Sequence, residues 1–138
     1  MEGLRQILRD LLRSRELFRL HSHKEAQERA NKFLMQNLSP AQRQQYKKHG
    51  YFDVTGGDTG KHYRIWHGNQ LNVEQIHQNG KHVRLCFMPR GGLPVGDIML
   101  AQKIALELFE SEALDVANGS LAWDQTFEGA MRSSRRSY

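Results

Sequence analysis

The segment from Tyr51 to Glu110 constrains the fold most, because short strand-like runs alternate there with glycine turns and then give way to one long apolar helix. Short runs rich in β-branched and aromatic residues, separated by Gly and Asn, are typical of antiparallel strands joined by hairpins. We therefore predict an α+β fold, in which a four-stranded antiparallel meander has N-terminal helices before it and one long helix after it. The predicted strands are 51–55, 62–67, 71–77 and a fourth run that begins after Gly80.

Asn79-Gly80 is the strongest short hairpin signal in this segment, because a type I′ turn needs positive φ at both central positions and these residues tolerate it. A two-residue turn at this point fixes the pairing of the flanking strands. The predicted pairs are Gln78 with Lys81, His77 with His82, Ile76 with Val83 and Val73 with Cys86. The expected core residues of the sheet are Phe52, Val54, Tyr63, Ile65, Val83, Leu85 and Phe87.

The first segment, Leu4 to Leu20, has the pattern of a basic amphipathic helix. Its apolar residues recur at helical spacing, at Leu4, Ile7, Leu8, Leu11, Leu12 and Phe18. The opposite face carries an arginine at every fourth position. The residues predicted to contact a partner are Arg5, Arg9, Arg13 and Phe18. Such a helix can lie in the groove of another protein or on an anionic surface. The alternative is a terminal helix that packs on its own domain and exposes its arginines to solvent.

Three further helices are predicted. A second helix covers 24–38, and a third covers 41–48, with Ser39 as its N-cap and Gly50 as its stop. After the sheet, Asp97 is a good N-cap for a helix that runs to Val116. These elements divide the chain into a basic amphipathic helix, an α+β domain and a basic C-terminal tail. Their predicted ranges are 1–20, 21–119 and 120–138.

Length and composition limit the class of protein. The 138 residues fit one domain, and the net charge of +5 permits a polyanionic partner without requiring one. Cys86 is the only cysteine, so the chain cannot form an internal disulfide. No apolar run approaches the roughly 20 residues that span a bilayer, and the arginine-rich N-terminus does not resemble a signal peptide. We expect a cytoplasmic or virion-associated protein that is not secreted and has no membrane partner.

No arrangement of residues demands a chemical reaction. The glycine-rich run 56–61 lies between two strands, and His62 stands where a phosphate loop would need Ser or Thr. His77 and His82 lack a third metal ligand at a recognisable spacing, and Cys86 lies in an apolar run that suppresses its thiolate. The residues interpreted as the solvated face of the long helix are Glu107, Glu110 and Glu112. We therefore predict no catalytic residue, no metal and no cofactor.

One group of residues favours nucleic acid as an alternative ligand. If the core residues above face inward, alternation along the strands sends basic and aromatic side chains to the other face of the sheet. Such a face can stack and neutralise single-stranded nucleic acid. The candidate residues on the sheet are Tyr51, Arg64, Trp66 and Arg84, with His62 and His82 beside them, and those in the tail are Arg132, Arg135 and Arg136. If the N-terminal helices cover this face instead, Trp66 belongs to the core.

From about Ala41 to Asn118 the chain resembles a small domain found in uncharacterised bacterial and phage-related proteins. The residues that carry the resemblance are Tyr63-Arg64-Ile65, Gly68, Asn72-Val73, Leu85-Cys86, Pro89, Leu93-Pro94, Asp97, Met99-Leu100-Ala101-Gln102-Lys103, Leu106-Glu107 and Ala117-Asn118. The resemblance implies an α+β domain. This family has no assigned reaction, so the resemblance transfers no catalytic residue.

The sequence is best interpreted as a non-enzymatic structural or protein-interaction module, one subunit of a larger bacterial or phage assembly. The first helix and the C-terminal tail are its expected docking arms. The expected partners are other protein subunits, including a second copy of the chain, and no small-molecule substrate is predicted. A nucleic-acid-binding domain is the alternative.

Overall fold

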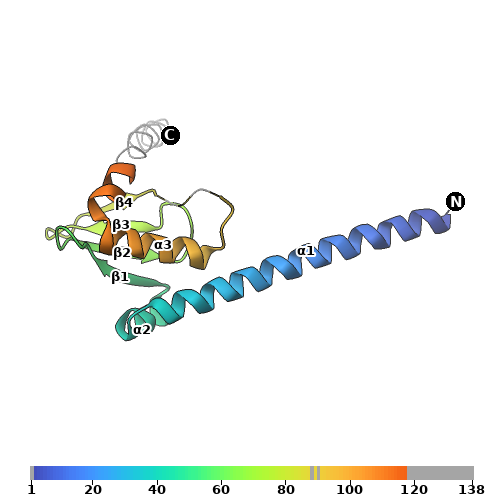
Figure 1. Ribbon diagram of the computed structural model, residues 1–138, viewed down its shortest axis with the longest axis horizontal. Helices are drawn as coiled ribbons and strands as arrows, with labels where there is room; N and C mark the ends of the chain where they lie inside the picture. The colour runs from blue at the N-terminus through green and yellow to red at the C-terminus, as the bar shows by residue number, and fades with distance from the viewer. Residues whose placement is uncertain (1, 88, 90, 118–138) are drawn as a thin grey trace, which may run out of the picture.

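The computed structural model describes residues 2–87, 89 and 91–117, and it confirms the α+β fold (Figure 1). The elements in chain order are α1 Glu2–Asn37, α2 Pro40–His49, β1 Tyr51–Thr55, β2 His62–Trp66, β3 Val73–Ile76, β4 His82–Leu85 and α3 Val95–Leu108. Residues 110–117 are also helical. No helix in this part of the chain combines the length and apolar character needed to cross a bilayer.

α1 is one uninterrupted helix of 36 residues, so the prediction of separate helices at 4–20 and 24–38 was wrong. The intervening residues contain neither Gly nor Pro, and ion pairs one turn apart bridge the region. His21 Nε2 lies 3.1 Å from Glu25 Oε1, and Lys24 Nζ lies 3.9 Å from Glu28 Oε1. The helix is about 54 Å long at 1.5 Å per residue, and among the described residues it is the C-terminal part of α1 that contacts the body of the protein (Figure 1).

The contact between α1 and α3 depends on a glycine. A Cβ atom at Gly96 would lie 2.6 Å from the carbonyl oxygen of Ala30, so a side chain there would push the two helices apart. Ala30 and Leu34 are the buried residues of α1. The side-chain oxygen of Gln27 also accepts a hydrogen bond from the backbone N–H of Val95, at 3.1 Å. The body therefore holds α1 firmly from about residue 27 onward.

α2 begins and ends as the sequence predicts. The Ser39 hydroxyl accepts from the N–H of Gln42 at 3.1 Å, and the Gln42 side chain accepts from the N–H of Ser39 at 3.0 Å, which forms a capping box. Gly50 ends the helix with φ of 75°. α2 also binds the backbone of the edge strand β1. The Gln45 side chain accepts a hydrogen bond from the Asp53 N–H at 2.7 Å, and the Gln42 side chain donates one to the Asp53 carbonyl at 2.9 Å.

The sheet is an antiparallel meander with the order β1-β2-β3-β4, but the predicted pairing of β3 with β4 was wrong by one residue. The observed pairs are Val73 with Leu85, Glu74 with Arg84, Gln75 with Val83 and Ile76 with His82. The His77 N–H donates to the Lys81 carbonyl and the Gly80 N–H to the His77 carbonyl, which leaves three residues in the loop. Gly80 has φ of 79° and Asn79 does not have positive φ, so this loop is not the type I′ turn that the dipeptide suggested.

α3 covers one face of the sheet, and the core lies between them (Figure 1). The predicted core residues of the sheet are buried except Val83, which is half-buried. A pair of buried amides also crosses this layer. Asn72 and Gln102 donate to each other at 2.8 and 3.0 Å, and Gln102 donates to the Phe87 carbonyl at 2.9 Å. Their polar atoms are thus satisfied inside the core.

The predicted helix from Asp97 to Val116 is two helices. α3 starts earlier, at Val95, with Pro94 at the N-cap and no side-chain cap, so the prediction of Asp97 as N-cap was wrong. The helix ends at Leu108, and Phe109 leaves helical geometry with φ of −136° and ψ of 42° before residues 110–117 resume it.

Candidate interaction surfaces

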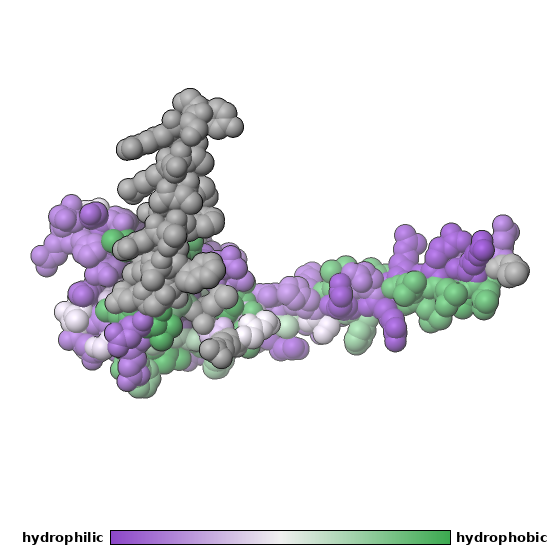
Figure 2. All heavy atoms as spheres, turned by 90° about the horizontal axis from the view of Figure 1, so that it is seen from above, coloured by the Kyte–Doolittle hydropathy of each residue, from purple (hydrophilic) through white to green (hydrophobic). Residues whose placement is uncertain are grey.

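The N-terminal part of α1 carries a continuous apolar stripe in solvent. All residues from 2 to 25 are exposed. The fractional exposures of Leu4, Leu11 and Phe18 are 65%, 58% and 76%. The stripe, which we define as Leu4, Ile7, Leu8, Leu11, Leu12 and Phe18, spans an arc of about 140° at 100° per residue. Figure 2 shows apolar side chains gathered along one side of the free end of this helix and hydrophilic ones along the other.

The four predicted partner-binding residues divide between two sides of this helix. Phe18 belongs to the stripe, whereas Arg5, Arg9 and Arg13 lie outside it. Among these arginines the structure gives one contact within the chain, from Arg9 Nε to the Arg5 carbonyl at 3.4 Å. The helix therefore presents an apolar side and a basic side, both exposed.

The open face of the sheet brings together the four sheet residues predicted for nucleic acid. Tyr51 pairs with Trp66 across β1 and β2, and Arg64 and Arg84 flank Glu74 on the neighbouring strands. The Tyr51 and Trp66 rings lie 4.6 Å apart, and the Arg64 guanidinium lies 3.9 Å above the Tyr51 ring. Trp66 is half-buried, so it is neither a fully buried core residue nor a fully exposed surface on which a base could stack.

The cations of this face already have carboxylate partners. Arg64 binds Asp53 at 2.8 Å and His62 binds the same carboxylate at 3.1 Å. Burial acts to raise the pKa of Asp53, but hydrogen bonds from Arg64, Gln45 and His62 hold the pKa below its usual value.

A second carboxylate neutralises the β4 side of the face. His82 lies 3.0 Å and Arg84 lies 3.4 Å from Glu74. Burial again acts to raise the pKa of Glu74, but the hydrogen bond from His82 and the charge of Arg84 hold it below its usual value. His82 therefore faces Glu74 and Ile76, not His77 as predicted. Within the described residues, no three His, Cys, Asp or Glu side chains are grouped as metal ligands.

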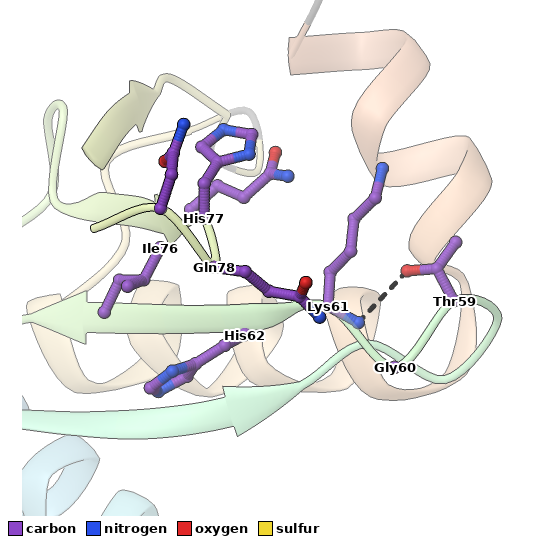
Figure 3. A pocket seen from close by; sticks show the side chains of 9 residues that line it. Thr59, Gly60, Lys61, His62, Ile76, His77 and Gln78 are labelled. Atoms are coloured by element: carbon purple, nitrogen blue, oxygen red, sulfur yellow. Dashed lines mark hydrogen bonds between the residues drawn. The ribbon is translucent and has the colours of Figure 1, made fainter. Parts of the chain in front are cut away.

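A cleft of about 620 Å³ lies between the tips of the two hairpins (Figure 3). Its lining residues are Thr59, Gly60, Lys61, His62, Gln75, Ile76, His77, Gln78 and Asn79. Figure 3 shows His62 and Ile76 directed to one side of the sheet, and Lys61 and His77 to the other. Because these charged and titratable side chains point to opposite sides of the sheet, they are not arranged to bind one ligand together.

Glu110 was wrongly predicted to lie on a solvated helix face. It is fully buried, and its carboxylate accepts hydrogen bonds from the Thr59 N–H and hydroxyl at 2.7 Å and from the Tyr63 hydroxyl at 2.9 Å. Burial acts to raise the pKa of Glu110, and the bonds from Thr59 and Tyr63 overcome it and lower the pKa. Burial and the adjacent carboxylate raise the pKa of the Tyr63 hydroxyl.

The glycine-rich loop between β1 and β2 fits into the break between the two C-terminal helices. The Gly57 N–H donates to the Leu106 carbonyl at 3.0 Å, and Asp58 accepts from the Ser111 N–H and hydroxyl at 3.0 and 2.9 Å. A Cβ atom at Gly56 would collide with the Glu110 carboxylate. A Cβ atom at Gly57 would likewise collide with the Glu107 carbonyl, so the contact explains Gly56 and Gly57 without a phosphate. Spacing alone did not reveal it, because the partner residues lie about 50 positions away in the chain.

The predicted tail residues Arg132, Arg135 and Arg136 lie outside the described residues. Comparisons of the chain with family models, with curated proteins and with solved structures each gave no match.

Proposed function

We propose that this protein is a non-enzymatic interaction module that joins a protein assembly through the apolar stripe of α1. The observation that carries the proposal is the exposure of every residue from 2 to 25, including all six members of the stripe. Contiguous apolar surface of this kind on a soluble protein marks an interaction site. The resemblance of residues 41–118 to a domain of bacterial and phage-related proteins supports an assembly of that origin.

Energetics support docking of the stripe. A helix in water owes much of its stability to packing of its apolar face, and residues 2–25 of α1 are exposed with respect to the rest of the described structure. Covering one large apolar side chain contributes about 1.5 to 3 kcal/mol. Six such residues on one side of one helix therefore offer a partner substantial binding energy, before the cost of ordering is subtracted.

Removing the residues before His21 tests this proposal. We expect the shortened chain to keep its sheet and α3, because the buried residues of α1 are Ala30 and Leu34. Circular dichroism and an amide NMR spectrum would check the fold, and sedimentation would check association. Association should be lost. If the shortened chain unfolds instead, the first helix belongs to the domain's own core and the proposal is wrong.

Binding of single-stranded nucleic acid to the open sheet face is the second candidate. The Tyr51, Trp66 and Arg64 cluster favours it, while the ion pairs to Asp53 and Glu74 leave little free positive charge there. Titration with a single-stranded oligonucleotide at low salt tests it. Trp66→Ala should weaken binding by about 1 to 3 kcal/mol if a base stacks there. Absence of binding at low salt would remove this candidate.

A further inference from the structure

We infer that the stripe pairs with the same stripe of other copies of this chain, as a short parallel coiled coil over residues 4–21. The inference rests on the proposed function and names the partner. Its seam follows a heptad pattern, with apolar residues at all three a positions and at the first d position, and polar residues at the two later d positions. The a positions are Leu4, Leu11 and Phe18, the d positions are Ile7, Ser14 and His21, and Leu8 flanks the seam at e.

Charge complementarity selects another copy as the occupant. The charged residues that flank the seam between 3 and 17 are Asp10 at g and Arg15 at e. In a parallel coiled coil, g of one helix lies beside the e position five residues further along the other, so Asp10 meets Arg15 of the other copy. Arg5, Arg9 and Arg13 fall at b, f and c, where they face solvent.

The same charges favour the parallel arrangement, because an antiparallel one places g beside g and e beside e. Asp10 at g and Arg15 at e would then not meet. Arg15 has no ion pair within the described chain, and Asp10 accepts one exposed side-chain bond, from Gln6 at 3.2 Å. Both groups are therefore available to another copy.

The body of the protein leaves room for this pairing. The face of α1 that contacts the body, marked by Ala30 and Leu34, lies about 150° around the helix from the seam at 100° per residue. The seam also ends before Gln27, where the contacts with the body begin. Two parallel copies would therefore carry their bodies on separate sides of the coiled coil.

Light scattering of the full chain over a range of concentrations tests the pairing with a matched pair of variants. Leu11→Asp changes the centre of the seam, and Leu20→Asp changes an equally exposed leucine outside the stripe, at an outward c position. We expect the wild type and Leu20→Asp to associate alike, and Leu11→Asp to weaken association by at least about a hundredfold. A wild-type chain that stays monomeric at all concentrations, or equal losses in both variants, would overturn the inference.

Charge exchange and cross-linking test the orientation. Arg15→Asp should weaken association about tenfold, and the double change Asp10→Arg with Arg15→Asp should restore it. In a Cys86→Ser background, Leu4→Cys should form an intermolecular disulfide, because parallel helices align these positions. Failure of the rescue together with absence of the disulfide would exclude parallel pairing. If the full chain is monomeric and removal of the residues before His21 still abolishes its assembly with another protein, this inference is wrong and the proposed function stands.

Discussion

At the scale of single residues, Glu110 joins the β1–β2 loop to the C-terminal helices. Its three donors come from Thr59 and Tyr63, residues about 50 positions away in the chain. A buried carboxylate is costly unless hydrogen bonds satisfy it, so each donor contributes to holding the loop and the helix break together. The same contact requires glycine at position 56, where a side chain would displace the carboxylate.

Glu110→Ala should lower the free energy of unfolding by about 3 kcal/mol, because it leaves the Tyr63 hydroxyl and the Thr59 N–H without their acceptor. Glu112→Ala is the matched control, since Glu112 is exposed on the same helix. Urea unfolding followed by circular dichroism measures both variants. Equal stability of the two would show that the Glu110 contact does not stabilise the fold.

The lowered pKa of Glu110 makes the stability of the fold depend on pH. Its folded pKa lies below the unfolded value of about 4.3, so its contribution is fully present above that value and is lost as pH falls through the folded pKa. Asp53 and Glu74, whose pKa values are also lowered, act in the same direction. Unfolding measured between pH 7 and pH 3 should show a steeper loss below pH 5 for the wild type than for Glu110→Gln. Parallel curves would contradict a lowered pKa.

At the scale of whole elements, α1 has two parts with different roles. Residues 2–25 are exposed, whereas the part that contains Ala30 and Leu34 packs on α3. Proline in a helix interior costs about 3 kcal/mol of stability. Placing a proline in one part or in the other therefore shows which part stabilises the body.

Ser14→Pro should leave the melting temperature of the body unchanged and abolish association, because residue 14 lies on the part without contacts to the body. Asn31→Pro, also at an exposed position, should destabilise the body by about 3 kcal/mol, because it disrupts the packed part. Calorimetry measures the melting temperature and light scattering the association. A lowered body melting temperature in Ser14→Pro would show that the two parts are coupled.

The sequence predicted most elements, and its errors have physical causes. Capping residues at Ser39 and Gly50, and alternation in β1 and β2, act locally, so α2, both strands and their inward faces were predictable. The continuity of α1 was missed because the polar residues near His23 looked like a boundary, although nothing there breaks a helix. The β3–β4 register was missed because Asn79-Gly80 fits more than one loop geometry.

The candidate surfaces were predictable in part. The stripe of α1 and the members of the open sheet face follow from periodicity alone. The neutralising contacts of Asp53 and Glu74, and the helix break that Asp58 and Glu110 hold, depend on partners that only the folded chain brings together.

At the scale of the whole molecule, a compact α+β body carries a long helical arm whose free half has an apolar side and a basic side (Figures 1 and 2). The arginines of the sheet face are paired with carboxylates, whereas all six residues of the stripe are exposed to solvent in the described structure. The central claim is that this free half of α1 is an interface.

Hydrogen–deuterium exchange of the full chain, measured at increasing protein concentration, tests that claim most directly. We expect amides 2–20 to exchange quickly in dilute solution and to become protected as copies associate, while the protection of the sheet stays constant. Leu11→Asp should keep 2–20 in fast exchange at every concentration. Fast exchange of 2–20 in the wild type even at high concentration, or protection that Leu11→Asp does not change, would contradict the account.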